Sequence, residues 1–205
     1  YSGCASAIGE RPYFQFHSKS ADHILDPIEI MVMKTIEEML FNLVWVAIDS
    51  FTGIRMSANW MWPCPKTDQH EGFLMYKAMQ TLCDICCQLE IAIDGGKDSL
   101  SMIAKHKIKT HDNTATEKVE EQVEVIKSPG SLVLTGYAAV PNIYLKTTPD
   151  MKPAFKNSTL LLVEREMPTC NTNLKEYISE MRDLFNLVQY FIKKQKIIAG
   201  HDCSD

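Results

Sequence analysis

The chain has 205 residues, of which 45% are hydrophobic, and its formal net charge at pH 7 is −5. This length and apolar content allow one sizeable hydrophobic core and part of a second domain. Binding to a nucleic-acid backbone is disfavoured, because it needs clustered lysines and arginines and the basic residues form no long run. No apolar stretch approaches the ~18 residues that a membrane span requires, and the N-terminus lacks a signal-peptide pattern. We therefore predict a cytoplasmic protein without nucleic-acid or membrane partners.

The seven cysteines, an odd number, fit reduced thiols in the cytosol better than a disulfide framework. Cys83, Cys86 and Cys87 fall in a segment with helical periodicity and have no second CxxC or histidine pair to complete a zinc site. We predict that they pack on a helix face as small hydrophobic side chains. The chain starts without methionine and stops soon after the apolar run 197–199, so we expect both ends to be cuts in a longer polypeptide.

The first predicted element is a helix that begins after Asp26. Asp26 as N-cap, Pro27 at the first helical position and Glu29 at the third match a capping box, and helical apolar spacing continues to about residue 47. Glu38 and Asn42 lie four residues apart, on roughly the opposite side from the predicted core face. That core face comprises Met33, Ile36, Leu40, Leu43, Val44 and Ala47.

The middle of the chain alternates predicted strands and helices. Residues 55–63 read as a strand or extended segment that ends at two prolines, and residues 71–90 as a second helix. The apolar run 89–93 predicts a brief buried strand that leads directly into a pair of glycines. Residues 107–122 are polar and aperiodic, as expected of an excursion in a hairpin, and residues 131–140 are rich in strand formers.

The last third of the chain reads as a linker followed by the start of a second unit. The linker covers residues 147–156, and residues 159–164 then predict a strand. Residues 173–194 predict a helix, and residues 196–199 a final strand that leads into the polar run 200–205.

The sequence Asp94-Gly95-Gly96-Lys97-Asp98-Ser99 places two glycines directly before an ammonium, a carboxylate and a hydroxyl. Glycines let a backbone approach a ligand closely, and the lysine and serine supply donors, which is a composition suited to phosphate. The Walker pattern fails, because Ile91 stands where its first glycine is required and Asp98 where Ser or Thr must follow the lysine. From spacing alone, an ordinary turn with a solvated lysine is the alternative interpretation.

Hard oxygen ligands for a magnesium nucleotide are available in Glu38, Asn42 and Asp202, although the sequence alone does not place them together. For Glu38 and Asn42 the alternative is a polar pair that stabilises a helix face.

Several motifs then occur in a definite order: Ala7-Ile8-Gly9-Glu10-Arg11-Pro12, Glu38 to Trp45, Ser57 to Trp62, Glu71-Gly72, Asp94 to Met102, Ser128 to Val133, Thr148 to Lys152 and Gly200 to Asp205. In this order and context they resemble the large, single-chain form of the phosphoribosylformylglycinamidine synthase family, over nearly the whole chain. The resemblance implies an ATP-dependent C–N ligase that converts formylglycinamide ribonucleotide to the amidine in de novo purine biosynthesis. The ammonia would be released from glutamine.

The resemblance also implies an α+β or α/β fold in the second of two tandem halves of a synthetase core. Residues 1–146 would form an aminoimidazole-ribonucleotide-synthetase-like N-type domain, residues 147–156 a linker, and residues 157–205 the truncated start of a C-type domain. The first half of the core and a glutaminase domain would be partners in cis. The catalytic histidine and the glutaminase residues would lie there, so we expect no catalytic residue in this chain and no activity from it alone.

Carried over by motif, the resemblance implies that Glu38, Asn42 and Asp202 bind Mg²⁺ at an auxiliary nucleotide, ATP or ADP. Ser204 would contact the same nucleotide. The four residues would make this chain the auxiliary nucleotide half of the synthetase core.

The glycine-rich stretch would form part of the substrate wall. Ser99 would contact the ribonucleotide substrate, and Gly96 and Lys97 would border the nucleotide or the substrate phosphate. Residues 165–170 depart from the resemblance, because an Arg-Leu-Gly-Gly-Ser-type segment usual in the family is missing there. This departure leaves a second interpretation open, in which the chain belongs to a catalytically degenerate homologue that acts as a binding or scaffold protein.

Overall fold

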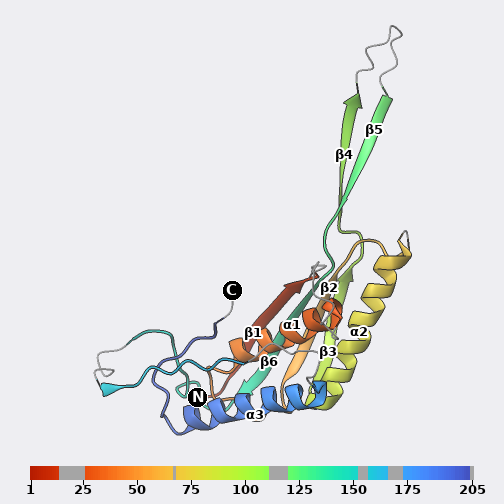
Figure 1. Ribbon diagram of the computed structural model, residues 1–205. Helices are drawn as coiled ribbons and strands as arrows, with labels where there is room; N and C mark the ends of the chain where they lie inside the picture. The colour runs from red at the N-terminus through yellow and green to blue at the C-terminus, as the bar shows by residue number, and fades with distance from the viewer. Residues whose placement is uncertain (14–25, 67, 111–119, 152–156, 166–172, 204–205) are drawn as a thin grey trace.

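Four strands of the computed structural model form one mixed sheet in the order β1–β6–β2–β3, and a separate hairpin of β4 and β5 projects from it (Figure 1). β1 and β2 both pair antiparallel with β6, whereas β3 runs parallel to β2. The structure describes residues 1–13, 26–66, 68–110, 120–151, 157–165 and 173–203. The strands are β1 Gly3–Pro12, β2 Arg55–Met61, β3 Ala92–Ser99, β4 Ile103–Thr110, β5 Glu120–Lys127 and β6 Ser131–Val140, and the helices are α1 Pro27–Leu43, α2 Gln69–Leu89 and α3 Leu174–Lys193.

Helix α1 begins at the capping box that the sequence predicts. The Ile28 N–H donates to the Asp26 carboxylate at 3.0 Å, and the Asp26 N–H donates to the Glu29 carboxylate at 3.1 Å. Asp26 also pairs with Lys77 of α2 at 2.6 Å. Burial favours the neutral form of Asp26, but these contacts outweigh it and hold the pKa of its carboxyl below the ordinary value.

The hydrophobic core lies between the sheet and the helices α1 and α2, which cover one face of it (Figure 1). Buried and less buried residues alternate along β2 and β6, as expected of strands with one face on a core. The close approach of α1 to β1 depends on Gly9, because a Cβ there would overlap the Thr35 carbonyl oxygen. The predicted core face of α1 is buried throughout: Met33, Ile36, Leu40, Leu43, Val44 and Ala47. The predicted mixed sheet with helices is therefore confirmed.

Helix α3 packs against α1 and α2 and extends their core (Figure 1). Tyr177, Ile178, Met181 and Phe185 belong to the same buried cluster as the residues of α1 and α2. The described part of residues 157–203 thus contributes its helix to the core of the preceding unit. The predicted division into two domains, with a linker at residues 147–156, stays a prediction.

Three predicted elements differ from the structure. The buried strand at residues 89–93 is wrong, because α2 continues to Leu89 and ends at Glu90 in the left-handed conformation. β3 starts only at Ala92, runs through both glycines at the edge of the sheet and is exposed. The strands at residues 159–164 and 196–199 are not formed either, since no strand of the described chain pairs with them. The apolar side chains at residues 160–163 are accordingly exposed.

The two adjacent glycines of β3 have different surroundings. Gly96 has φ 156°, and a Cβ there would overlap the Ala58 carbonyl oxygen on β2. A Cβ at Gly95 would meet only Ser57 Oγ, at 3.9 Å, which is an ordinary contact. The second glycine is therefore needed for the pairing of β3 with β2, whatever else it contacts.

Gly96→Ala is expected to lower the free energy of unfolding by about 1–3 kcal/mol, because the new methyl group forces β3 away from β2. Gly95→Ala is the matched control and is expected to change it by less than about 0.5 kcal/mol. Thermal unfolding and amide hydrogen exchange along β3 measure the difference. Equal effects of the two substitutions would contradict the assignment of the close approach to Gly96.

The surface of α2 carries two of the three clustered cysteines. Cys86 is buried, and burial raises the pKa of its thiol to about 12, which confirms the packing prediction for this residue. The prediction is wrong for Cys83 and Cys87, which the turn of the helix exposes to solvent.

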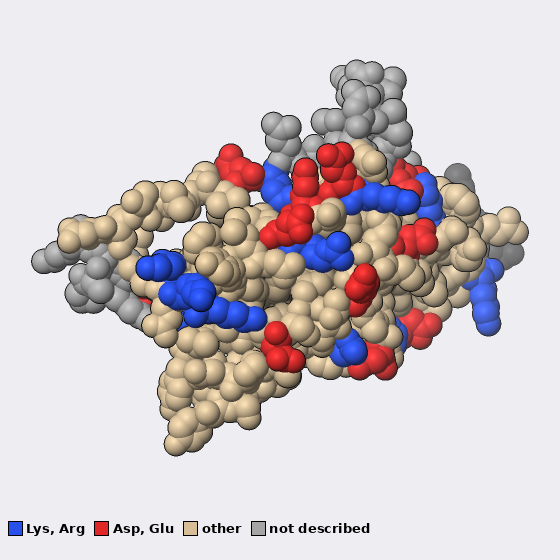
Figure 2. All heavy atoms as spheres, turned by 90° about the horizontal axis from the view of Figure 1, so that it is seen from below, with Lys and Arg blue, Asp and Glu red and all other residues tan. Residues whose placement is uncertain are grey.

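Acidic and basic side chains intermingle on the face shown in Figure 2. Within the described residues, no helix combines the length and the hydropathy needed to cross a membrane.

Candidate functional site

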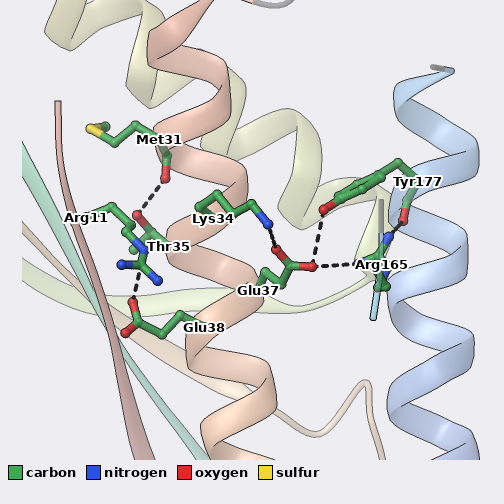
Figure 3. Close-up of polar contacts among 8 residues, drawn as sticks. All are labelled: Arg11, Met31, Lys34, Thr35, Glu37, Glu38, Arg165 and Tyr177. Carbon is green, nitrogen blue, oxygen red and sulfur yellow. Dashed lines mark hydrogen bonds and ion pairs between the residues drawn. The ribbon is translucent and has the colours of Figure 1, made fainter. Parts of the chain in front are cut away.

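Glu38 and Asn42 lie on the side of α1 that faces the free edge of β1. Glu38 Oε2 accepts a hydrogen bond from the Glu10 backbone N–H at 2.9 Å. The same oxygen lies 3.5 Å from Arg11 Nε (Figure 3). One turn later, Asn42 Nδ2 donates to the Ile8 carbonyl oxygen at 2.9 Å. Because β1 is an edge strand, these backbone groups have no strand on that side, and the two side chains satisfy them.

These contacts engage one carboxylate oxygen of Glu38 and the amide nitrogen of Asn42. Both contacts of Glu38 fall on Oε2, and Asn42 donates through Nδ2, so its Oδ1 points away from Ile8. A carboxylate oxygen and an amide oxygen one helical turn apart suit a hard divalent cation. The i, i+4 spacing correctly predicts that Glu38 and Asn42 share a helix face. It misses their hydrogen bonds to β1, because the strand order cannot be read from the sequence.

Three chain segments meet at a junction beside the end of α1. The Thr147 N–H donates to the Trp45 carbonyl at 2.7 Å, and the Gly200 N–H donates to the Thr148 carbonyl at 3.2 Å. Gly200 lies so close to the indole of Trp45 that a Cβ on it would overlap the ring. We call this arrangement the junction; it consists of residues 45–47, 145–148 and 200–202. Its first residue, Trp45, follows Asn42 by three positions.

Asp202 is the candidate ligand that the junction holds. Its side chain is 10% exposed, and its Oδ1 lies 3.2 Å from Nδ1 of His201. The other oxygen, Oδ2, is buried without a hydrogen-bond partner. A buried carboxylate oxygen without a partner is costly in a folded protein, so it fits a site that binds a cation or a donor.

The residues predicted to form the substrate wall lie on the opposite edge of the sheet from β1. Lys97 on β3 lies in one row with Asn59, Val133 and Glu10 across the four strands. At about 4.8 Å per strand, its backbone is on the order of 14 Å from that of Glu10. Lys97 Nζ donates to Ser99 Oγ at 2.6 Å, so these two side chains lie together, and Gly96 immediately precedes Lys97 in the strand.

The structure thus groups Glu38 with Asn42 and groups Lys97 with Ser99, but it does not bring the two pairs into contact. The junction with Asp202 includes Trp45, which follows Asn42 by three residues. Ser204 lies outside the described residues. The roles of all the predicted site residues stay predictions.

A polar cluster that the sequence reasoning missed joins α1 to α3 (Figure 3). Glu37 Oε1 accepts hydrogen bonds from Arg165 at 2.9 Å and from the Tyr177 hydroxyl at 3.2 Å, while Lys34 lies 2.6 Å from Oε2. The Arg165 guanidinium lies 3.9 Å from the centre of the Tyr177 ring. Burial, and next the charge of Glu37, raise the pKa of the Tyr177 hydroxyl. The adjacent glutamates of α1 therefore have different partners: Glu38 contacts β1, and Glu37 contacts Arg165 and α3.

A second missed residue, Gln189 of α3, fixes the loop that follows α1. Its Oε1 accepts from the Ile48 N–H at 3.0 Å, and its Nε2 donates to the carbonyls of Val44 at 2.6 Å and Val46 at 2.8 Å. The available signal was a glutamine at a core position of an amphipathic helix. The buried residues around it are Ile178, Met181, Phe185 and Ile192.

Within the described chain, no group of three or more His, Cys, Asp and Glu side chains could hold a metal ion. Glu38 and Asp202 provide two carboxylates, and Asn42 provides an amide oxygen. Mg²⁺ normally keeps several waters and binds protein through one or two carboxylates plus phosphate, so this donor set fits a magnesium nucleotide better than a cation bound by protein alone.

The architecture defines an α+β domain in which a helix places a carboxylate and an amide beside a sheet edge. Residues 1–139 match the model of the FGAR-AT PurM_N-like domain, and the chain belongs to this family.

Curated relatives match along the whole chain. It is 33% identical over 226 residues to the phosphoribosylformylglycinamidine synthase of Dictyostelium discoideum, 36% over 222 residues to that of Drosophila melanogaster and 29% over 220 residues to that of Homo sapiens. The matches cover 100%, 100% and 99% of this chain but 15%, 14% and 14% of the relatives. The chain therefore spans about 15% of the length of these relatives.

A solved structure, phosphoribosylformylglycinamidine synthase II from Thermotoga maritima, is 13% identical and overlaps 94% of this chain and 25% of that chain, with a TM-score of 0.46.

Proposed function

We propose that the polypeptide carrying this chain is a phosphoribosylformylglycinamidine synthase. It converts formylglycinamide ribonucleotide to the amidine, with ATP and with ammonia released from glutamine, in de novo purine biosynthesis. The similarity over 99–100% of the chain to curated enzymes of that name carries the proposal. The first half of the synthetase core and the glutaminase domain act in cis, in the cytoplasm.

In this proposal the chain supplies an auxiliary Mg²⁺–nucleotide site, with ATP or ADP as the nucleotide. Glu38 and Asn42 offer oxygen ligands from α1, and Asp202 offers a carboxylate from the junction. Bound Mg²⁺ would neutralise phosphate charge, as it does in other nucleotide sites. Ser204 contacts the nucleotide. The support for this assignment is the unpartnered, buried Oδ2 of Asp202 beside the end of the helix that carries the other two ligands.

The same proposal places part of the substrate wall on β3. The Lys97 ammonium offers a positive charge to a phosphate, and the Ser99 hydroxyl, which Lys97 contacts, offers a further donor to the ribonucleotide. Gly96 precedes them on the same exposed edge strand.

Glu38→Gln and Asp202→Asn test the nucleotide site in the intact polypeptide. Each keeps the shape of the side chain but removes a negative charge, and the glutamine of the first variant retains an oxygen for the Glu10 N–H. We expect the affinity of one Mg²⁺–ADP site, measured by isothermal titration calorimetry, to fall about 30-fold, which corresponds to about 2 kcal/mol. Asp84→Asn, at an exposed carboxylate of α2, is the matched control and is expected to bind as the parent does.

Unchanged binding in both site variants would remove the auxiliary-site assignment. The activity is tested separately, by supplying the intact polypeptide with formylglycinamide ribonucleotide, ATP and glutamine and measuring amidine and ADP. If the nucleotide binds normally but no amidine forms, the degenerate homologue that acts as a binding or scaffold protein replaces the enzyme.

A further inference from the structure

Three buried polar atoms of the junction lack a hydrogen-bond partner. They are Nε1 of Trp45, Oγ1 of Thr148 and Oδ2 of Asp202. Among the described residues, the only other side-chain atoms in this state are Oδ1 of Asn59 and Nε1 of Trp62. Buried polar groups are nearly always paired, so three unpaired atoms in one junction indicate a missing ligand.

The three atoms come from segments that the backbone holds against one another. The hydrogen bond between Thr147 and Trp45 joins the first two segments, and the one between Gly200 and Thr148 joins the second and third. The contact of Gly200 with the indole closes the junction. Asp202 is nine-tenths buried there, although it follows Gly200 by only two residues near the end of the described chain. The arrangement is therefore a built site and not a surface loop.

The chemistry of the three atoms is complementary. The indole N–H of Trp45 can only donate, the carboxylate oxygen of Asp202 can only accept, and the hydroxyl of Thr148 can do both. Carboxylate and hydroxyl oxygens are hard ligands that suit a divalent cation. An N–H donor does not coordinate a cation, but it does bind the anionic oxygen that accompanies one.

We infer that Thr148 and Trp45 belong to the nucleotide site at Asp202, with the Thr148 hydroxyl holding the divalent cation or its bound water and the Trp45 N–H donating to a phosphate oxygen. The inference rests on the proposed function, because it adds two residues to the auxiliary Mg²⁺–nucleotide site. Trp45 follows Asn42, another proposed ligand near the end of α1, by three residues. The competing explanation is structural: the three side chains only pack the junction and bind nothing.

Mn²⁺ titration of the intact polypeptide, followed by electron paramagnetic resonance with and without ADP, separates these explanations. Asp202→Asn first identifies the Mn²⁺ sites that depend on this junction. At those sites Thr148→Val is expected to weaken Mn²⁺ binding about tenfold, with or without ADP. Trp45→Phe is expected to leave binding of Mn²⁺ alone unchanged and to weaken binding of ADP about tenfold.

Two further variants control for packing. Thr147→Val makes the same substitution at the adjacent position, whose hydroxyl is not among the unpaired atoms, and should bind as the parent does. Thr148→Ser keeps the hydroxyl and should retain the Mn²⁺ affinity that Thr148→Val loses, even if the valine variant folds less stably.

The failure of this inference is distinguishable from the failure of the proposed function. If Asp202→Asn loses Mn²⁺ sites while Thr148→Val and Trp45→Phe bind as the parent does, the inference is overturned and the auxiliary site stands. If Thr148→Ser weakens Mn²⁺ binding as much as Thr148→Val, the hydroxyl has no role and the inference is again overturned. If Asp202→Asn retains every Mn²⁺ site, Asp202 holds no cation and the two added residues are wrong with it; the auxiliary site as a whole is wrong if Glu38→Gln also binds as the parent does.

Discussion

Replacing Gln189 with leucine is expected to reduce the local stability of the loop of residues 44–48 by about 3–6 kcal/mol, because two buried backbone groups and one partly buried group lose a hydrogen bond at about 1–2 kcal/mol each. Gln189 is 5% exposed. Its side-chain amide accepts a hydrogen bond from the Ile48 N–H and donates hydrogen bonds to the carbonyls of Val44 and Val46. Leucine has nearly the same size but offers neither donor nor acceptor. Cavity formation therefore contributes little to the expected loss.

Native-state hydrogen exchange measures this loss of stability at the individual amides of the loop, within the intact polypeptide. A loss of about 3 kcal/mol corresponds to at least ~100-fold faster exchange, at about 1.4 kcal/mol per factor of ten. The informative amides are those of Ala47 and Ile48, which bond Leu145 and Gln189 respectively. Asn186→Leu, on the exposed side of α3, makes a similar amide-to-leucine change and should leave the exchange rates unaltered.

Gln189→Glu distinguishes hydrogen bonding from shape. Glutamate keeps an acceptor for the Ile48 N–H, but it places an oxygen where the Nε2 donor meets two carbonyls. It should therefore release the loop at least as strongly as leucine does. A glutamate variant with the parent's exchange rates would show that the loop does not depend on these hydrogen bonds.

Local signals predicted the helices and the central strands. The capping box at Asp26 and the apolar spacing of α1 follow from the residues themselves, and the structure confirms both. The helix ends earlier than predicted, because residues 45–47 turn away to bond with residues 145–147, about 100 positions along the chain. No local pattern contains that partner.

The candidate site depends on long-range contacts that no local sequence pattern reveals. The hydrogen bonds of Glu38 and Asn42 to β1 arise because β1 is an edge strand, and the strand order follows from the whole sheet. The glycines of β3 read as a turn because adjacent glycines usually mark one, whereas Gly96 lies in a strand that approaches β2 closely. Asp202 could be selected as a candidate by its chemistry, but only the fold places it in the junction with Trp45.

Arg165→Met is expected to destabilise the contact between α1, α3 and residues 157–165 by about 2–4 kcal/mol. Arg165 pairs with Glu37 at 2.9 Å, donates to the Tyr177 carbonyl at 2.7 Å and stacks on the Tyr177 ring. Both side chains of the ion pair are largely buried, so methionine leaves Glu37 with Lys34 as its remaining cation. Removing one partner of a buried pair costs more than the pair itself contributes, because the other charge stays in a poorly solvated place.

Arg165→Lys separates charge from geometry, since lysine keeps the positive charge but cannot stack as a planar group or bond Glu37 and the Tyr177 carbonyl with one rigid fork. We expect about half of the methionine effect, measured as faster hydrogen exchange of the first turn of α3. Arg182→Met, on α3 and outside this cluster, is the matched control.

If lysine fully replaces Arg165, charge alone anchors the segment and the stacking on Tyr177 contributes nothing. If methionine is also neutral, the exposed apolar residues 160–163 do not depend on this anchor, and the segment is held by contacts other than the cluster at Glu37.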